Sequence, residues 1–112
     1  AEGVSLLTLH AAKGLEFRVV FIVGCEEGLL PLTYDGRVDP EQEAEERRLL
    51  FVGMTRAQER RFLTHAQRRR WMGRVRTPEP SRFLADLPAR FVRRRTHTVR
   101  RVPTGGRQLE LF

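Results

Sequence analysis

The chain has 112 residues, 40% of them apolar, which is enough for one small core but too short for two domains. No apolar run approaches the roughly 20 residues that a membrane-spanning helix needs, and no signal-peptide pattern opens the sequence. The formal net charge is +7, but residues 1–59 carry −5 and residues 60–112 carry +12. A basic half of this kind suits a polyanion such as nucleic acid, although a solvated arginine-rich tail would have the same composition. The single cysteine, Cys25, cannot form an internal disulfide and favours a reducing compartment.

Two short apolar and β-branched runs, at residues 4–9 and 18–24, are predicted to be buried strands. The residues between them, 10–17, contain Gly14 and predict a loop with one helical turn. Residues 25–42 are rich in glycine and proline and predict a longer loop.

A helix is predicted over residues 40–59, because Pro40 suits the first turn and glutamates follow where the helix dipole favours negative charge. Residues 61–67 predict another strand, and residues 73–80 predict a loop. Ser81 is the expected N-cap of a short helix that Pro88 ends.

From residue 89 onward the sequence has few apolar residues and dense positive charge, so we expect disorder unless a partner binds it. The order of elements predicts an α/β fold, but about three strands make a thin sheet. We therefore expect this sequence to be a piece of a longer protein that supplies further strands.

Two segments carry a family resemblance. TLHAAKGLEF at residues 8–17 and EAEERRLLFVGMTRAQER at residues 43–60 resemble motifs V and VI of the UvrD/Rep/PcrA family of superfamily 1 DNA helicases. The connecting VVFIVGCEEGLLP and the later PSRFLADLP are also similar to that family, so the resemblance covers residues 4–88. It implies a partial RecA-like, three-layer α/β domain of the P-loop NTPase type with a mostly parallel sheet over residues 1–88. A basic tail would occupy residues 89–112.

The resemblance implies an ATP-contacting set. Arg56 would be the arginine finger, since a guanidinium stays protonated and presents a rigid fork of donors to phosphate oxygens. Glu16 would accept a hydrogen bond from the nucleotide ribose, with Lys13 and Gly14 in the same loop near the nucleotide. Without the resemblance, Arg56 would read as an ordinary surface arginine, Glu16 as a solvated loop acid and Lys13 as a local salt-bridge donor.

Thr8 and His10 resemble the motif V positions that touch single-stranded DNA, where a hydroxyl and an imidazole can bind phosphate without reading sequence. The pattern GxxxxGK[ST] is not found in the sequence. The phosphate-binding loop and the Mg²⁺ ligands for ATP are therefore expected on an N-terminal helicase domain that this sequence lacks, and the fragment alone is predicted to be inactive. One cysteine and three histidines give no zinc spacing, so no metal site is expected.

The last five residues, QLELF, resemble the peptide by which bacterial repair and replication proteins dock on the DNA sliding clamp. In that interpretation Gln108 hydrogen-bonds at the rim of a pocket while Leu109, Leu111 and Phe112 enter it. An apolar terminus that packs on its own domain would have the same sequence.

The expected function is that of the C-terminal part of an ATP-dependent 3′-to-5′ DNA helicase in the bacterial cytoplasm, associated with the nucleoid, and no membrane partner is expected. The alternative is a non-catalytic nucleic-acid or sliding-clamp-binding module. Related helicase–nuclease subunits share both motifs, but the sequence shows no nuclease carboxylate cluster.

Overall fold

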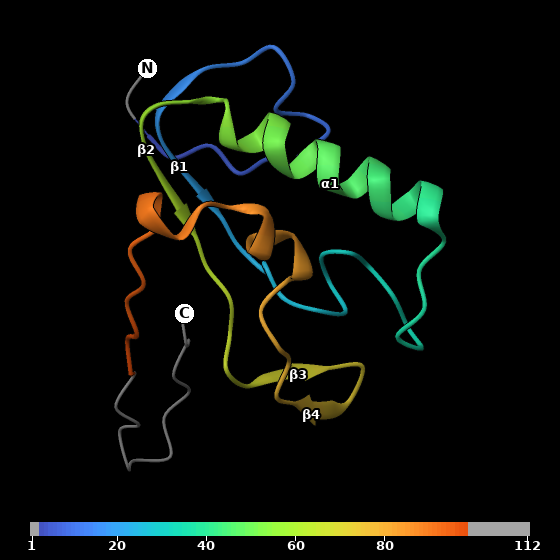
Figure 1. The fold of residues 1–112 in the computed structure, drawn as a ribbon. Coiled ribbons are helices and arrows are strands. Elements are labelled where there is room, and N and C mark those ends of the chain that lie inside the picture. Colours follow the sequence, from blue (N-terminus) through green and yellow to red (C-terminus); the bar gives the residue numbers. More distant parts are fainter. Residues whose placement is uncertain (1–2, 99–112) are drawn as a thin grey trace.

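The computed structural model describes residues 3–98, which form a small α/β fold (Figure 1). The elements are, in chain order, β1 (Phe17–Ile22), α1 (Pro40–Met54), β2 (Ala57–Leu63), β3 (Arg69–Trp71), β4 (Arg74–Arg76) and two short 3-10 helices, η1 (Arg82–Asp86) and η2 (Ala89–Phe91). The strands β1 and β2 form one sheet and β3 and β4 another. None of the helices in this part of the chain is both long enough and apolar enough to cross a membrane.

The strands β1 and β2 are parallel, with Val20 opposite Arg61 and Ile22 opposite Leu63. Parallel neighbours need a crossover connection, and α1 provides it while packing against both strands. The strand predicted over residues 18–24 is therefore present as β1, but it is not buried as predicted, because only Ile22 is buried while Val19 and Phe21 are exposed. On the face away from the core, the rings of Phe21 and Phe62 stack with centroids 4.6 Å apart and stay exposed.

The core is small and gathers residues from β1, the loop after it, α1 and η1. Its buried apolar members are Ile22, Cys25, Leu30, Leu50 and Phe83. The Phe83 side chain is the largest of those that are fully buried, and the guanidinium carbon of Arg47 lies 5.0 Å from its ring centre. One aromatic ring from near the end of the described chain thus fills the space between α1 and β1.

The helix α1 begins at Pro40 as predicted, with acidic residues in its first turn. It ends at Met54, short of the predicted end, and β2 starts at Ala57 rather than at residue 61. The pairing explains the shift, because residues 57–63 form a ladder with β1 that a longer helix would remove. Tertiary pairing overrides local helix preference at this boundary.

The predicted strand at residues 4–9 is wrong. Residues 3–8 adopt neither helix nor strand, and the side chains of Val4 and Leu6 are each 92% exposed. Within residues 3–98 no strand pairs in a sheet with the backbone amides and carbonyls of this segment. An apolar, β-branched composition does not by itself fix a strand.

The loop predicted at residues 73–80 is instead partly a β-hairpin, since β3 and β4 pair with Trp71 opposite Arg74. Met72 and Gly73 join the strands with φ values of 54° and 75°. Two consecutive positive φ values characterise type I′ hairpin turns, which usually carry Asn-Gly or Asp-Gly. Because methionine is unusual at the first position of such a turn, the sequence did not predict the hairpin.

The hairpin is fastened to the loop after β1 by Glu26, whose side chain is almost completely buried. Its carboxylate accepts hydrogen bonds from Nε and Nη2 of Arg69, at 2.8 and 3.0 Å, and from the backbone N–H of Ala66 at 3.1 Å. The hydrogen bond with Glu26 is the main reason that the pKa of Arg69 is raised. Two-point pairing of this kind fixes orientation as well as distance.

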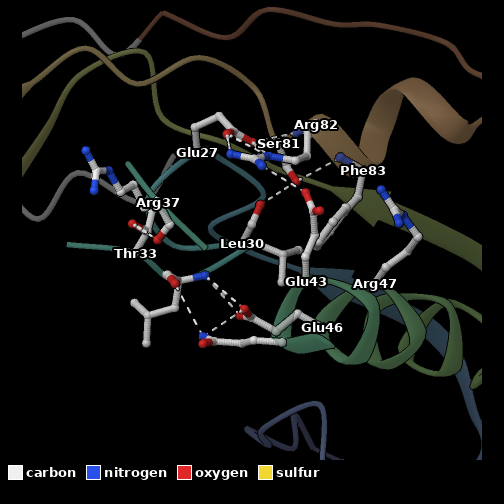
Figure 2. A network of polar contacts seen from close by, with 12 residues as sticks. Glu27, Leu30, Thr33, Arg37, Glu43, Glu46, Arg47, Ser81, Arg82 and Phe83 are labelled. Atoms are coloured by element: carbon white, nitrogen blue, oxygen red, sulfur yellow. Dashed lines mark hydrogen bonds and ion pairs between the residues drawn. The ribbon is translucent and has the colours of Figure 1, made fainter. Parts of the chain in front are cut away.

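The helix η1 joins the loop after β1 to α1 (Figure 2). Ser81 accepts the backbone N–H of Phe83 at 3.2 Å, which confirms the predicted N-cap, and its hydroxyl donates to the Leu30 carbonyl. Arg82 bridges Glu27 and Glu43 with N–O distances of 2.6 and 2.8 Å. The short helix predicted here is thus present in 3-10 form and anchors α1 from one side.

Candidate functional site

The residues just before β1 and β2 lie at the same end of the parallel pair. Phe17 and Ala57 are register partners, so Glu16 and Arg56 precede two adjacent strand starts. The backbone N–H of Phe17 also donates to the carbonyl of Arg56 at 2.8 Å. The two motif segments, 8–17 and 43–60, thus meet at this point. We call Leu15, Glu16, Thr55, Arg56 and Gln58 the amino-end cluster.

The Arg56 guanidinium is bound only to neutral oxygens among the described residues. Its Nε donates to the Val52 carbonyl at 3.1 Å, Nη2 to the Thr55 hydroxyl at 3.1 Å and Nη1 to the Leu15 carbonyl at 3.4 Å. No carboxylate among residues 3–98 forms an ion pair with it. The side chain is half-buried, so its position is defined while its charge remains available to an anion.

Glu16 is exposed, and its carboxylate accepts a hydrogen bond from Nε2 of Gln58 at 3.1 Å. Gln58 comes from β2 and was not singled out in the sequence. The parallel register explains the contact, because Ala57 is opposite Phe17 and this brings the start of β2 beside residue 16. Gln58 could have been predicted as a partner of Glu16 only if the start of β2 at Ala57 had been predicted correctly.

The loop at residues 8–16 carries the other predicted site residues. The N–H of Ala12 donates to the Thr8 carbonyl at 3.2 Å, which confirms the single helical turn predicted between the first two apolar runs. Thr8, His10 and Lys13 are all exposed. Gly14 has φ of 81°, a left-handed conformation that disfavours other residues.

The groups with shifted pKa lie outside the amino-end cluster and are structural. Burial acts to raise the pKa of Glu27, but hydrogen bonds and charge from Arg82 together bring it below its ordinary value. Hydrogen bonds with Glu27 and Glu43 raise the pKa of Arg82. Burial raises the pKa of Cys25 to about 11, and its thiol donates to the Ile22 carbonyl.

The candidate clamp-binding residues Gln108, Leu109, Leu111 and Phe112 lie outside the described residues. Within residues 3–98 no group of three His, Cys, Asp or Glu side chains is placed to hold a metal ion. The described chain therefore offers a guanidinium and a carboxylate at one end of a parallel strand pair, beside a turn with exposed polar side chains.

Residues 1–68 match the family model of the UvrD-like helicase C-terminal domain, and the chain belongs to this family. It is 52% identical to the ATP-dependent DNA helicase PcrA of Leuconostoc citreum over 75% of this chain and 11% of that protein. It is 52% identical to the ATP-dependent DNA helicase Rep of Escherichia coli (strain K12) over 78% of this chain and 13% of that protein. Against DNA helicase II of the same organism, the identity is 48% over 81% of this chain and 12% of that protein. The chain thus spans a small part of the length of these relatives.

Proposed function

We propose that this chain is the C-terminal part of an ATP-dependent DNA helicase and supplies one side of its ATP site. In this proposal, residues 1–88 complete the second RecA-like domain and residues 89–112 form a basic tail. A first RecA-like domain outside this sequence supplies the phosphate-binding loop and the Mg²⁺ ligands. The observation that carries the proposal is the guanidinium of Arg56, which forms no ion pair within residues 3–98 and lies beside the loop of Glu16, at one end of two parallel strands.

In this role Arg56 neutralises the negative charge that develops on the γ-phosphate during hydrolysis. Its hydrogen bond to the Leu15 carbonyl, at 3.4 Å, is at the long limit for such bonds. A phosphate oxygen would be the stronger acceptor because the resulting hydrogen bond joins two charged groups. The bonds from Nε to Val52 and from Nη2 to Thr55 are shorter and would keep the side chain aimed while Nη1 changes partner.

The exposed carboxylate of Glu16 is proposed to accept a hydrogen bond from a ribose hydroxyl, with Gln58 holding it in place. Lys13 and Gly14 would lie along the nucleotide in the same loop. Thr8 and His10 would contact phosphates of single-stranded DNA, along which the intact protein moves 3′ to 5′. Contacts of this type hold the strand without reading its bases.

Replacing Glu16 with alanine in the intact protein is expected to raise the KM for ATP about tenfold, with kcat changed by less than about threefold, because a hydrogen bond to a charged acceptor is lost. Steady-state ATP hydrolysis at saturating single-stranded DNA measures both. ATP analogues that lack one ribose hydroxyl should lose affinity for the original protein but not for the variant.

The matched control is Glu59→Ala, which removes an exposed carboxylate paired with Arg18 on the same sheet. It is expected to leave the KM for ATP within about twofold, since exposed ion pairs contribute little. An unchanged KM in Glu16→Ala would exclude the ribose contact.

We further propose that Gln108, Leu109, Leu111 and Phe112 dock on the DNA sliding clamp. Deleting residues 108–112 from the intact protein should then abolish clamp binding, measured by surface plasmon resonance, and leave DNA-stimulated ATP hydrolysis unchanged. A variant in which the same five residues are present in scrambled order controls for tail length. Equal clamp affinity with and without the five residues would contradict this proposal.

The alternative function, a non-catalytic nucleic-acid or clamp-binding module, makes a different forecast for the intact protein. It would bind DNA or the clamp but hydrolyse no ATP in the presence of single-stranded DNA. The ATP assay described above therefore separates the two functions.

A further inference from the structure

Gly53 is a buried glycine in the last turn of α1, and the space at its Cα is occupied by Leu9. A Cβ added to Gly53 would lie 2.5 Å from Cδ2 of Leu9 and 3.2 Å from Cδ1 of Ile22. Helix preference does not account for glycine at this position, because alanine is the better helix former. The close approach of Leu9 does account for it.

Leu9 belongs to a compact turn. Its neighbours Thr8 and His10 are exposed, whereas Leu9 is half-buried and packs against the core. The N–H of Ala12 donates to the carbonyls of Thr8 and Leu9, at 3.2 and 3.3 Å, and the N–H of Ala11 donates to the Thr8 hydroxyl at 3.1 Å. These bonds hold the turn together, so a displacement of Leu9 would carry Thr8 and His10 with it.

Gly53 also holds Arg56, because its carbonyl accepts the backbone N–H of Arg56 at 3.2 Å. The far end of the same loop reaches the Arg56 guanidinium through the Leu15 carbonyl. The loop is therefore attached to the end of α1 at two points, through the apolar side chain of Leu9 and through a polar backbone group. Figure 1 shows this blue segment before β1 running beside the C-terminal half of α1.

We propose that Leu9 and Gly53 form a positioning contact that sets the Thr8–His10 turn relative to Arg56 and so couples DNA binding to ATP turnover. The inference rests on the proposed function, in which Thr8 and His10 contact DNA and Arg56 contacts ATP. Leu9 and Gly53 touch neither ligand in this arrangement. They act by positioning Thr8, His10 and Arg56, and binding at either the DNA site or the ATP site can shift their contact.

The test is a double-mutant cycle in the intact protein, with ATP hydrolysis measured as a function of single-stranded DNA concentration. Gly53→Ala should displace Leu9 and raise the DNA concentration for half-maximal stimulation about threefold to tenfold. The KM for ATP at saturating DNA should stay within about twofold, because Arg56 keeps its backbone contacts. Leu9→Val removes the Cδ atoms and should also weaken the DNA response by loosening the turn.

The double variant Gly53→Ala/Leu9→Val should return half-saturation to within about twofold of the original protein, because the alanine methyl then occupies the space left by the shorter side chain. A control, Ala44→Gly, changes helix preference at an exposed site on the same helix and should leave the DNA response unchanged. Melting temperatures of all variants, by circular dichroism, separate loss of folding from loss of coupling.

The positioning contact alone would be overturned if the effects of Gly53→Ala and Leu9→Val simply add in the double variant. It would also be overturned if a folded Gly53→Ala protein has an unaltered DNA response. If Gly53→Ala does not fold, the comparison of the DNA response between Leu9→Val and the double variant decides the question instead. Absence of DNA-stimulated ATP hydrolysis in the unmodified intact protein would instead overturn the proposed function, and this inference with it.

Discussion

Replacing Arg56 with alanine in the intact protein is expected to lower kcat for DNA-stimulated ATP hydrolysis by about 10³-fold or more, the range found when an arginine finger is removed. The reason is that no other cation of the amino-end cluster can neutralise charge on the γ-phosphate. Affinity for single-stranded DNA should change by less than about threefold, since Thr8 and His10 keep their turn. Pre-steady-state hydrolysis and fluorescence anisotropy with labelled DNA measure the two quantities.

Two further variants make this test specific. Arg56→Lys keeps a positive charge but loses the planar fork, so it should retain only a small part of the activity. Arg60→Ala removes an exposed arginine of β2 that forms no ion pair within residues 3–98, and should leave kcat within about twofold. Near-normal turnover in Arg56→Ala would show that the guanidinium does not act on the phosphate.

Replacing Phe83 with alanine is expected to destabilise this part of the protein by about 3–5 kcal/mol, which is typical for a fully buried phenylalanine. The change opens a cavity between α1 and β1 and also removes the ring beneath Arg47. Hydrogen exchange of the Ile22 and Leu50 backbone amides, followed by mass spectrometry, should accelerate by about two to four orders of magnitude.

Phe91→Ala is the matched control, because Phe91 lies in the neighbouring 3-10 helix and its side chain is 75% exposed. It should change stability by less than about 0.5 kcal/mol. Phe83→Leu should fall between the two, since it keeps most of the apolar volume but loses the ring. Similar exchange rates in Phe83→Ala and Phe91→Ala would refute a central role for Phe83.

Features determined by local sequence were predictable. The strand β1, the turn after Thr8, the start of α1 at Pro40 and the cap at Ser81 each depend on neighbouring residues. Proline at a helix start and serine at an N-cap act through their own backbone and hydroxyl groups, so sequence alone carries the signal. The family was indicated by the resemblance of residues 8–17 and 43–60 to helicase motifs V and VI, and the comparisons confirm it.

Features determined by distant partners were not predictable. The segment at residues 4–9 has strand composition but no pairing strand within residues 3–98, and the end of α1 is set by the ladder between β1 and β2. The β3–β4 hairpin depends on a left-handed Met72 that no propensity favours.

The candidate site follows the same rule. The motifs named Arg56 and Glu16, but Gln58 and the contact between Leu9 and Gly53 appear only when the parallel register and the packing of α1 are known. A glycine that is unfavourable for a helix is explained by a side chain from 44 positions earlier in the sequence.

The buried thiol of Cys25 provides a native chemical reporter for this region. Alkylating reagents attack the thiolate, and a side chain that is enclosed and has a pKa of about 11 offers almost none at neutral pH. Labelling of Cys25 by iodoacetamide would therefore record each event that exposes the interior, without an introduced dye or isotope. In a longer protein, peptide mapping would assign the label to Cys25. Transient opening of the core around Cys25 could thus be measured during ATP turnover.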